Sequence, residues 1–246
     1  EKVRLVPEPV HRDRIVTPYR IDPFTIPLEK KTDLLLNTME TLHRQSGIAR
    51  SSASLWARRD RKLLVSTEGT HLEFDLLAGQ GECTVTALHE GRFASRGFST
   101  PHLRKGYELI EEADLLREAT RVAAQAIEKV KAPTVDAGQY DLVLDPEHLS
   151  LTIHESCGHP SELDRALGYE ANYAGTSFLT SEKLGNFRYG SQHVNLVADN
   201  TEPETLAATG YDDDGVQCQQ WDIVRNGVFV GYCTNREVAS KISESR

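Results

Sequence analysis

His154, Glu155 and His159 are the residues whose types and spacing most directly indicate chemistry. They lie in the stretch TIHESCGHPSE, residues 152–162, where a His-Glu pair is followed by a second histidine five positions after the first. Neutral imidazoles bind zinc, and a carboxylate beside them can take a proton from a water molecule. Taken alone, however, the pattern is explained better by two partly buried histidines with structural roles.

The five-residue spacing constrains the backbone that could bring the two histidines together. Asp145, followed by Pro146, predicts the start of a helix that continues into the motif. On a regular α-helix, side chains five positions apart diverge by about 140°, so His154 and His159 could not reach one ion. In a single π-type turn, residues five apart come onto one face.

Two neighbouring residues favour such a distortion. Gly158 tolerates unusual backbone angles, and Pro160 removes a backbone donor and directs its ring at the carbonyl group four residues earlier, near Ser156. The sequence therefore predicts that the helix is bulged or broken at the motif, with Glu155 beside the two histidines as a candidate base.

The first half of the chain predicts a sheet covered by helices. Apolar residues recur at helical spacing over residues 28–46 and again over 111–131. Between them, residues 52–98 contain strand-length runs separated by turn-forming residues, which predicts an antiparallel meander of about five strands. The basic stretch ARRDRK, residues 57–62, is expected at a solvated hairpin tip.

The second half predicts long ordered loops and further strands. Residues 160–191 are rich in glycine, asparagine, serine and tyrosine, and a hairpin is expected around Asn226-Gly227. We expect an α+β fold in two domains: residues 1–135, an N-terminal α+β domain, and residues 136–246, a β-rich domain that carries the motif helix. Both domains are expected to be truncated, the first at its start and the second at its end.

Composition narrows the function classes. The formal net charge of −9 and the absence of any long apolar run argue against nucleic-acid and membrane partners. The four cysteines show no closely spaced pairs, which favours reduced thiols in a soluble, cytoplasmic protein.

Several blocks of sequence together resemble one family. HESCGH followed by PSELDRALGYEANYAGTSFLT, the later GYDDDGV, the VRNGVFVGY hairpin and the earlier YRIDPFTIPLEKK are similar to the TldD/PmbA family, and specifically to its TldD-type zinc metallopeptidases. The resemblance implies a largely antiparallel N-terminal domain, a β-rich C-terminal domain and hydrolysis of small or unfolded peptides.

The same resemblance assigns roles to residues. It implies that His154 and His159 bind Zn²⁺ and that Glu155 activates the attacking water. The family's third ligand is a cysteine, which we expect beyond residue 246. The resemblance also implies a homo- or hetero-dimer with a TldD/PmbA-family subunit. We further expect a substrate peptide to add as a strand to a sheet edge near the motif helix.

Two other functions remain open on the sequence. Cys157, flanked by the two histidines, could act as the nucleophile of a thiol-dependent hydrolase. Alternatively, the chain could be a non-catalytic partner or scaffold subunit of a TldD/PmbA-type complex. Cys218 and Cys233 are expected to pack as small apolar residues, and Asp212-Asp213-Asp214-Gly215 to form a turn rather than a cation site.

Overall fold

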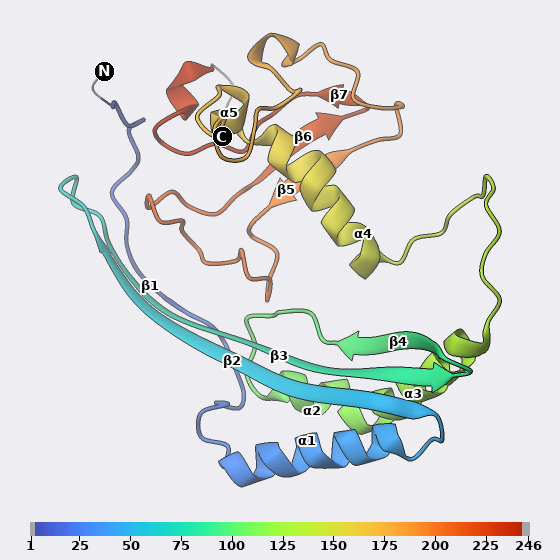
Figure 1. The fold of residues 1–246 in the computed structure, drawn as a ribbon. Coiled ribbons are helices and arrows are strands. Elements are labelled where there is room, and N and C mark those ends of the chain that lie inside the picture. The colour runs from blue at the N-terminus through green and yellow to red at the C-terminus, as the bar shows by residue number, and fades with distance from the viewer. Residues whose placement is uncertain (1–2, 243–246) are drawn as a thin grey trace.

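The first half of the chain folds into a four-stranded mixed sheet with helices on one face (Figure 1). This computed structural model describes residues 3–242. The central strand β3 (His71–His89) pairs along nearly its whole length with β2 (Ile48–Val65), which is antiparallel to it. On its other side, β3 pairs first with the parallel strand β1 (Arg12–Val16) and then with the antiparallel strand β4 (Arg92–Ser99).

The expected number of strands in the meander is wrong, because residues 48–99 form three strands rather than about five. The stretch 57–62 lies inside β2, where Arg59 forms an ion pair across the ladder with Asp75 at 2.6 Å. Gly79 and Gly81 lie inside β3, and a Cβ atom at Gly81 would come within 2.8 Å of Ile110 on the covering layer. Both glycines therefore lie within a strand rather than a turn, and Gly81 marks a close approach of a helix to the sheet.

Three helices cover this sheet: α1 (Leu28–His43), α2 (Glu108–Ala113) and α3 (Leu115–Lys131) (Figure 1). The apolar stripe of α3 packs with Leu42, Val85 and Ala87 in a fully buried cluster, as its periodicity predicts. The helix expected over 111–131 is interrupted at Asp114, which has a φ of 47° and accepts a hydrogen bond from the Arg117 N–H. The side chain of Asp114 thus caps the N-terminus of α3.

The second half contains short elements joined by long loops. Helix α4 (Pro146–Ile153) leads through a π-helical turn (His154–Gly158) and a 3-10 turn (His159–Ser161) to the short helix α5 (Leu163–Ala166). A small antiparallel sheet follows, and 3-10 turns occur at Ser181–Lys183 and Ala239–Lys241. The strands of that sheet, in spatial order, are β5 (Leu196–Asp199), β6 (Gln220–Arg225) and β7 (Val228–Phe229).

The hairpin between β6 and β7 confirms its sequence signal. Asn226 and Gly227 both have positive φ angles, 50° and 78°, as a tight hairpin turn with this pair requires. A Cβ atom at Gly227 would lie 2.3 Å from the carbonyl oxygen of Ser191, so the position also demands glycine for space. Behind this sheet, Phe229 and Tyr232 form the centre of a second buried cluster with Leu163 and Leu179.

The two halves contact each other along the N-terminal strands. Tyr211 packs into a buried cluster with Leu72 and Phe74, and Arg236 pairs with Glu68 at 2.9 Å. The aspartate-rich segment beside Tyr211 forms a turn, as expected, in which the Asp212 side chain accepts backbone N–H groups from residues 214 and 216.

Within residues 3–242, no helix combines the length and the apolar character that crossing a membrane would require.

Candidate metal centre

Helix α4 leads directly into the motif, and both lie at exposed positions. As predicted, Asp145 caps it: the carboxylate accepts the Glu147 N–H at 2.9 Å, and Pro146 occupies the first turn. No residue of α4 is buried, although Leu151 and Ile153 are apolar. The helix is held by its cap, by the turn that follows it and by the Ser99 hydroxyl of β4, which donates to the Glu147 carboxylate at 3.1 Å.

The motif itself adopts a π-helical turn, which confirms that the helix is bulged there. The turn spans His154–Gly158, and the His159 N–H bonds to the His154 carbonyl, five residues earlier. This extra residue per turn brings His154 and His159 onto one face. Their ring centroids are 4.3 Å apart with planes inclined by 73°.

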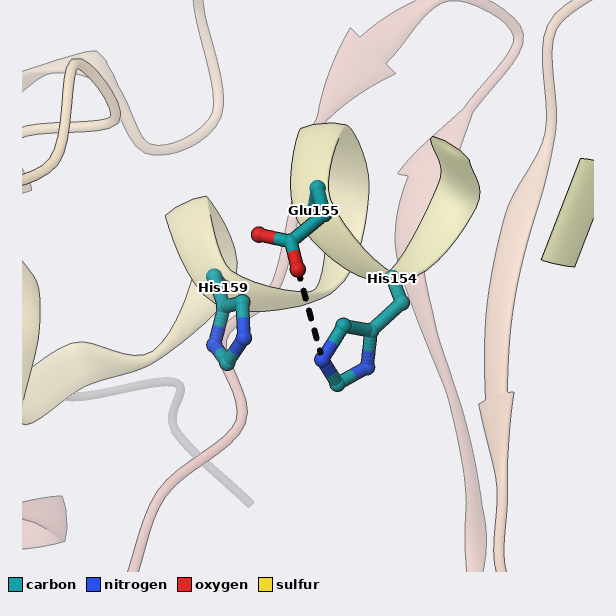
Figure 2. A group of neighbouring side chains, drawn as sticks. All are labelled: His154, Glu155 and His159. Atoms are coloured by element: carbon teal, nitrogen blue, oxygen red, sulfur yellow. Dashed lines mark ion pairs between the residues drawn. The ribbon is translucent and has the colours of Figure 1, made fainter. Parts of the chain in front are cut away.

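Glu155 lies beside the two rings (Figure 2). Its carboxylate is 4.0 Å from His154 Nε2, and one donor atom from each of His154, Glu155 and His159 can be chosen so that all three lie within 4.8 Å of one another. The side chains of His154 and Glu155 remain 60% and 61% exposed, so water and a substrate can reach them.

The cause that the sequence suggested for the bulge is only half right. Gly158 has φ −65° and ψ −69°, in the right-handed region that any residue adopts, so the freedom of glycine is not used there. Pro160 does act as expected: it has no N–H for the Ser156 carbonyl. The Tyr189 hydroxyl donates to that carbonyl instead, at 2.8 Å.

Tyr189 therefore braces the π turn from a loop more than 30 residues further along the chain. Its hydroxyl also lies 3.2 Å from Cys157 Sγ. Burial, followed by the hydrogen bond with the Cys157 thiol, raises the pKa of Tyr189, so the hydroxyl keeps its proton at neutral pH. A permanent donor consequently faces the carbonyl that Pro160 leaves without a backbone partner.

A second set of polar contacts holds His159. Its Nδ1 lies 2.9 Å from Glu162 Oε1, and the other oxygen of Glu162 accepts the Arg165 Nε–H at 3.0 Å. Arg165 also pairs with Glu170 at 2.9 Å and donates to the Ala174 carbonyl at 2.8 Å. Sequence reasoning missed this network, although the three-residue steps from His159 to Glu162 and Arg165 were a signal that it could have used.

The other candidate residues of the sequence lie outside the three-residue cluster. Cys157 faces Tyr189, and Cys233 lies against the second buried cluster, where burial raises the pKa of its thiol. Cys218 contacts Thr209 and the Ala207 carbonyl. Asp213 is engaged with Lys62 at 2.6 Å.

The donor set fits zinc. Zinc binds histidine nitrogens at about 2.0–2.1 Å, so two nitrogens on one ion are at most about 4.2 Å apart. The ligand atoms of His154, Glu155 and His159 all lie within 4.8 Å of one another, close to this limit, and the His154 side chain is exposed enough to rotate. Because Nδ1 of His159 is engaged by Glu162, its Nε2 is the atom left for a metal, as in many zinc sites where a carboxylate holds the ligand histidine.

Family models match both halves of the chain, and both describe metallopeptidases. Residues 21–132 match the PmbA/TldA metallopeptidase central domain, and residues 137–246 match the PmbA/TldA metallopeptidase C-terminal domain. The chain belongs to the PmbA/TldD family.

Individual relatives agree with this membership. A metalloprotease of Methanocaldococcus jannaschii is 25% identical over 225 residues, which are 91% of this chain and 47% of the relative. A zinc metalloprotease TldD homolog of Saccharolobus solfataricus is 25% identical over 191 residues, 77% of this chain and 38% of the relative. The chain thus spans less than half the length of these relatives.

The fold also recurs in solved structures. A proposed modulator of a DNA gyrase from Thermotoga maritima superposes with a TM-score of 0.77 at 19% identity, covering 98% of this chain and 52% of that one. The two-part arrangement of sheet layer and motif region is therefore shared with a solved structure.

Proposed function

We propose that the chain carries the two histidine ligands and the general base of a zinc-dependent peptidase. The observation that supports this most strongly is the π turn, because it brings His154, Glu155 and His159 within 4.8 Å of one another despite a spacing that a regular helix could not use. The metalloprotease names of the relatives point to the same class of reaction.

Each residue of the cluster has a distinct role in this proposal. His154 and His159 hold the zinc ion, which when bound supplies the Lewis acidity that peptide hydrolysis requires. Glu155 takes the proton of the attacking water and returns a proton to the leaving amine. The high exposure of Glu155 leaves room for both the water and the scissile peptide beside it.

Two imidazoles alone bind zinc weakly, so the proposal includes a further ligand. We propose a cysteine thiolate from a part of the full-length protein beyond residue 246, because a thiolate would offset the charge of the ion and still leave an open position. We also propose a domain boundary between residues 135 and 136, within the exposed connection that leads from α3 to α4.

The proposed substrates are small or unfolded peptides bound as an added strand. Strand β5 is at the edge of the three-stranded sheet, and such an edge presents backbone groups that an extended peptide can pair with. Backbone pairing would favour unfolded chains over particular side chains. We further propose that the full-length protein works as a dimer with itself or with another subunit of the family.

The alternative functions have less support. A thiol mechanism through Cys157 would need a histidine to take its proton, whereas the contact that Cys157 makes is with the Tyr189 hydroxyl. A purely structural partner subunit would have no need for a turn that gathers two imidazoles and a carboxylate.

Zinc analysis and peptide hydrolysis with the full-length protein test the proposal. Glu155→Gln should retain zinc and lose activity by about 10²- to 10⁴-fold, because it removes the proton acceptor. His154→Ala should lose both zinc and activity. Unchanged turnover in Glu155→Gln would contradict the proposal, and loss of turnover only in Cys157→Ser would support the thiol mechanism instead.

A further inference from the structure

The two histidines of the cluster are held very differently. His154 is 60% exposed, and Glu155, at 4.0 Å, is the ion-pair partner found for it among the described residues. His159 is 31% exposed and is connected through Glu162 to Arg165, whose own side chain is only 13% exposed. One ligand is thus free to adjust, while the other is fixed before any metal arrives.

The local backbone explains how Glu162 reaches His159. The 3-10 turn that follows the π turn has three residues per turn, so side chains three positions apart lie directly above one another. Glu162 then adopts an extended conformation and starts α5, on which Arg165 follows after three more residues. The three side chains consequently form a row on one side of this segment.

The hydrogen bonds determine which nitrogen of His159 carries the proton. Two groups face Nδ1 of His159: Glu162 Oε1 at 2.9 Å and Arg165 Nη2, a donor, at 3.4 Å. An ionised carboxylate can only accept, so the shorter contact with Glu162 favours the proton on Nδ1 and leaves the lone pair on Nε2. Arg165 occupies the other carboxylate oxygen, and it is itself held by Glu170 and by the Ala174 carbonyl. Glu162 therefore has little freedom to turn away from the imidazole.

From this arrangement we infer that Glu162 and Arg165 are positioning residues, which hold His159 in the tautomer and orientation that bind the metal. The inference rests on the proposed zinc site and extends it to residues outside the motif. Glu162 acts on His159 directly, and Arg165 acts by fixing Glu162 and by tying it to the loop that carries Glu170 and Ala174.

Zinc affinity of the full-length protein, measured by competition with a chromogenic chelator, tests this role. Carboxylates that hold ligand histidines typically contribute 10- to 100-fold to metal affinity, so Glu162→Ala should weaken zinc binding by about that factor. Glu162→Gln keeps an acceptor oxygen and should restore most of the affinity. Asp164→Asn is the matched control: it removes a charge two residues away, and its amide oxygen can still accept the Arg165 backbone N–H.

A second measurement needs neither metal nor activity. Nitrogen-15 NMR of labelled histidine in the metal-free protein should show His159 with its proton on Nδ1, and Glu162→Ala should shift it toward the Nε2-protonated form that free histidine favours. This readout covers the case in which Glu162→Ala loses stability, because the tautomer is also measured in the unmodified protein.

The outcomes separate the inference from the function on which it rests. Zinc affinity in Glu162→Ala within about twofold of the unmodified protein, or a His159 proton on Nε2 in the unmodified protein, overturns the positioning role. Failure of the unmodified protein to retain zinc overturns the proposed function instead, and the tautomer measurement still decides whether Glu162 orients the ring.

Discussion

Helices α3 and α4 both carry apolar side chains, but the fold treats them in opposite ways. Most of the apolar stripe of α3 is buried against β3 and β4, whereas α4 buries no residue and leaves Leu151 65% exposed. The first helix is stabilised by removing apolar surface from water. The second depends on an aspartate cap, a tyrosine brace and a glutamate–arginine network around the turn that follows it.

This difference distinguishes the sheet layer, which supports the fold, from the segment around the π turn, which carries the residues of the proposed site. The proposed base and the two proposed ligand histidines must be reached by water and substrate, so they cannot be held by burial. Directional polar contacts fix a side chain and still leave it accessible. We therefore expect substitutions in the sheet layer to change stability, and substitutions around the π turn to change metal binding more than stability.

The largest effect on stability is expected at Glu108, a buried carboxylate in the supporting layer. Its two oxygens accept the backbone N–H groups of Arg20, Ile21 and Gly106 at 2.9–3.1 Å. Glu108→Ala leaves these donors without a partner, and at about 1–3 kcal/mol each it should lower the free energy of unfolding by at least 3 kcal/mol. Chemical denaturation checks this, and a loss clearly below about 3 kcal/mol would contradict it.

Glu108 should also make stability depend on pH. Burial acts to raise the pKa of Glu108, but the backbone donors outweigh it and the pKa ends below its ordinary value. Its contribution is therefore complete above the unfolded-state pKa of about 4.3 and is lost as the pH falls through the lower folded value. Denaturation between pH 7 and pH 3 should show a steeper acid loss in the unmodified protein than in Glu108→Gln, which does not titrate.

A matched pair of leucines tests the comparison of the two helices directly. Leu115 on α3 is 2% exposed, and Leu151 on α4 is 65% exposed. Leu115→Ala should destabilise by about 2–5 kcal/mol because it leaves a cavity, while Leu151→Ala should stay within about 0.5 kcal/mol. Equal losses in thermal denaturation would mean that α4 is covered by apolar contacts in the full-length protein.

Tyr189→Phe should have a smaller effect that falls mainly on the site. It removes one hydrogen bond to the Ser156 carbonyl, worth about 0.5–1.5 kcal/mol, and keeps the ring contact with Phe178. With the brace gone, the π turn should hold its two histidines less firmly. The measurement is zinc competition, with Tyr173→Phe, at a residue that is 92% exposed, as the control; identical affinities in both variants would rule out the bracing role.

The smallest effect is expected at Gly158. Its φ is negative, and a Cβ atom there would meet nothing nearer than the Ile153 carbonyl oxygen at 3.9 Å. Gly158→Ala should therefore change the free energy of unfolding by less than about 1 kcal/mol, and in the stabilising direction, since alanine favours helical angles. A large loss of stability or of zinc affinity would instead indicate that the π turn needs the conformational freedom of glycine at this position, as the sequence suggested.

Local sequence signals predicted the elements where neighbouring residues decide the structure. The Asp145 cap, the hairpin at Asn226-Gly227 and the amphipathic stripe of α3 all follow from residues within a few positions of one another. Signals failed where a distant element changed their meaning. Gly79 and Gly81 are among the turn-forming residues from which about five strands were expected, because the sequence does not show that Ile110 of a covering helix packs against Gly81.

The motif likewise combines features that neighbouring residues predict with features that depend on distant elements. The sequence by itself determined that two histidines five apart need a bulged helix, and that Pro160 leaves the Ser156 carbonyl without its backbone donor, because both follow from local backbone geometry. Only the tertiary structure decided that Tyr189 would supply that donor and that Glu162 and Arg165 would hold His159. The contact with a hydroxyl 33 residues away depends on packing that no local spacing specifies. The three-residue steps from His159 to Glu162 and Arg165 allow their contacts, but the spacing alone does not fix the direction in which the carboxylate turns.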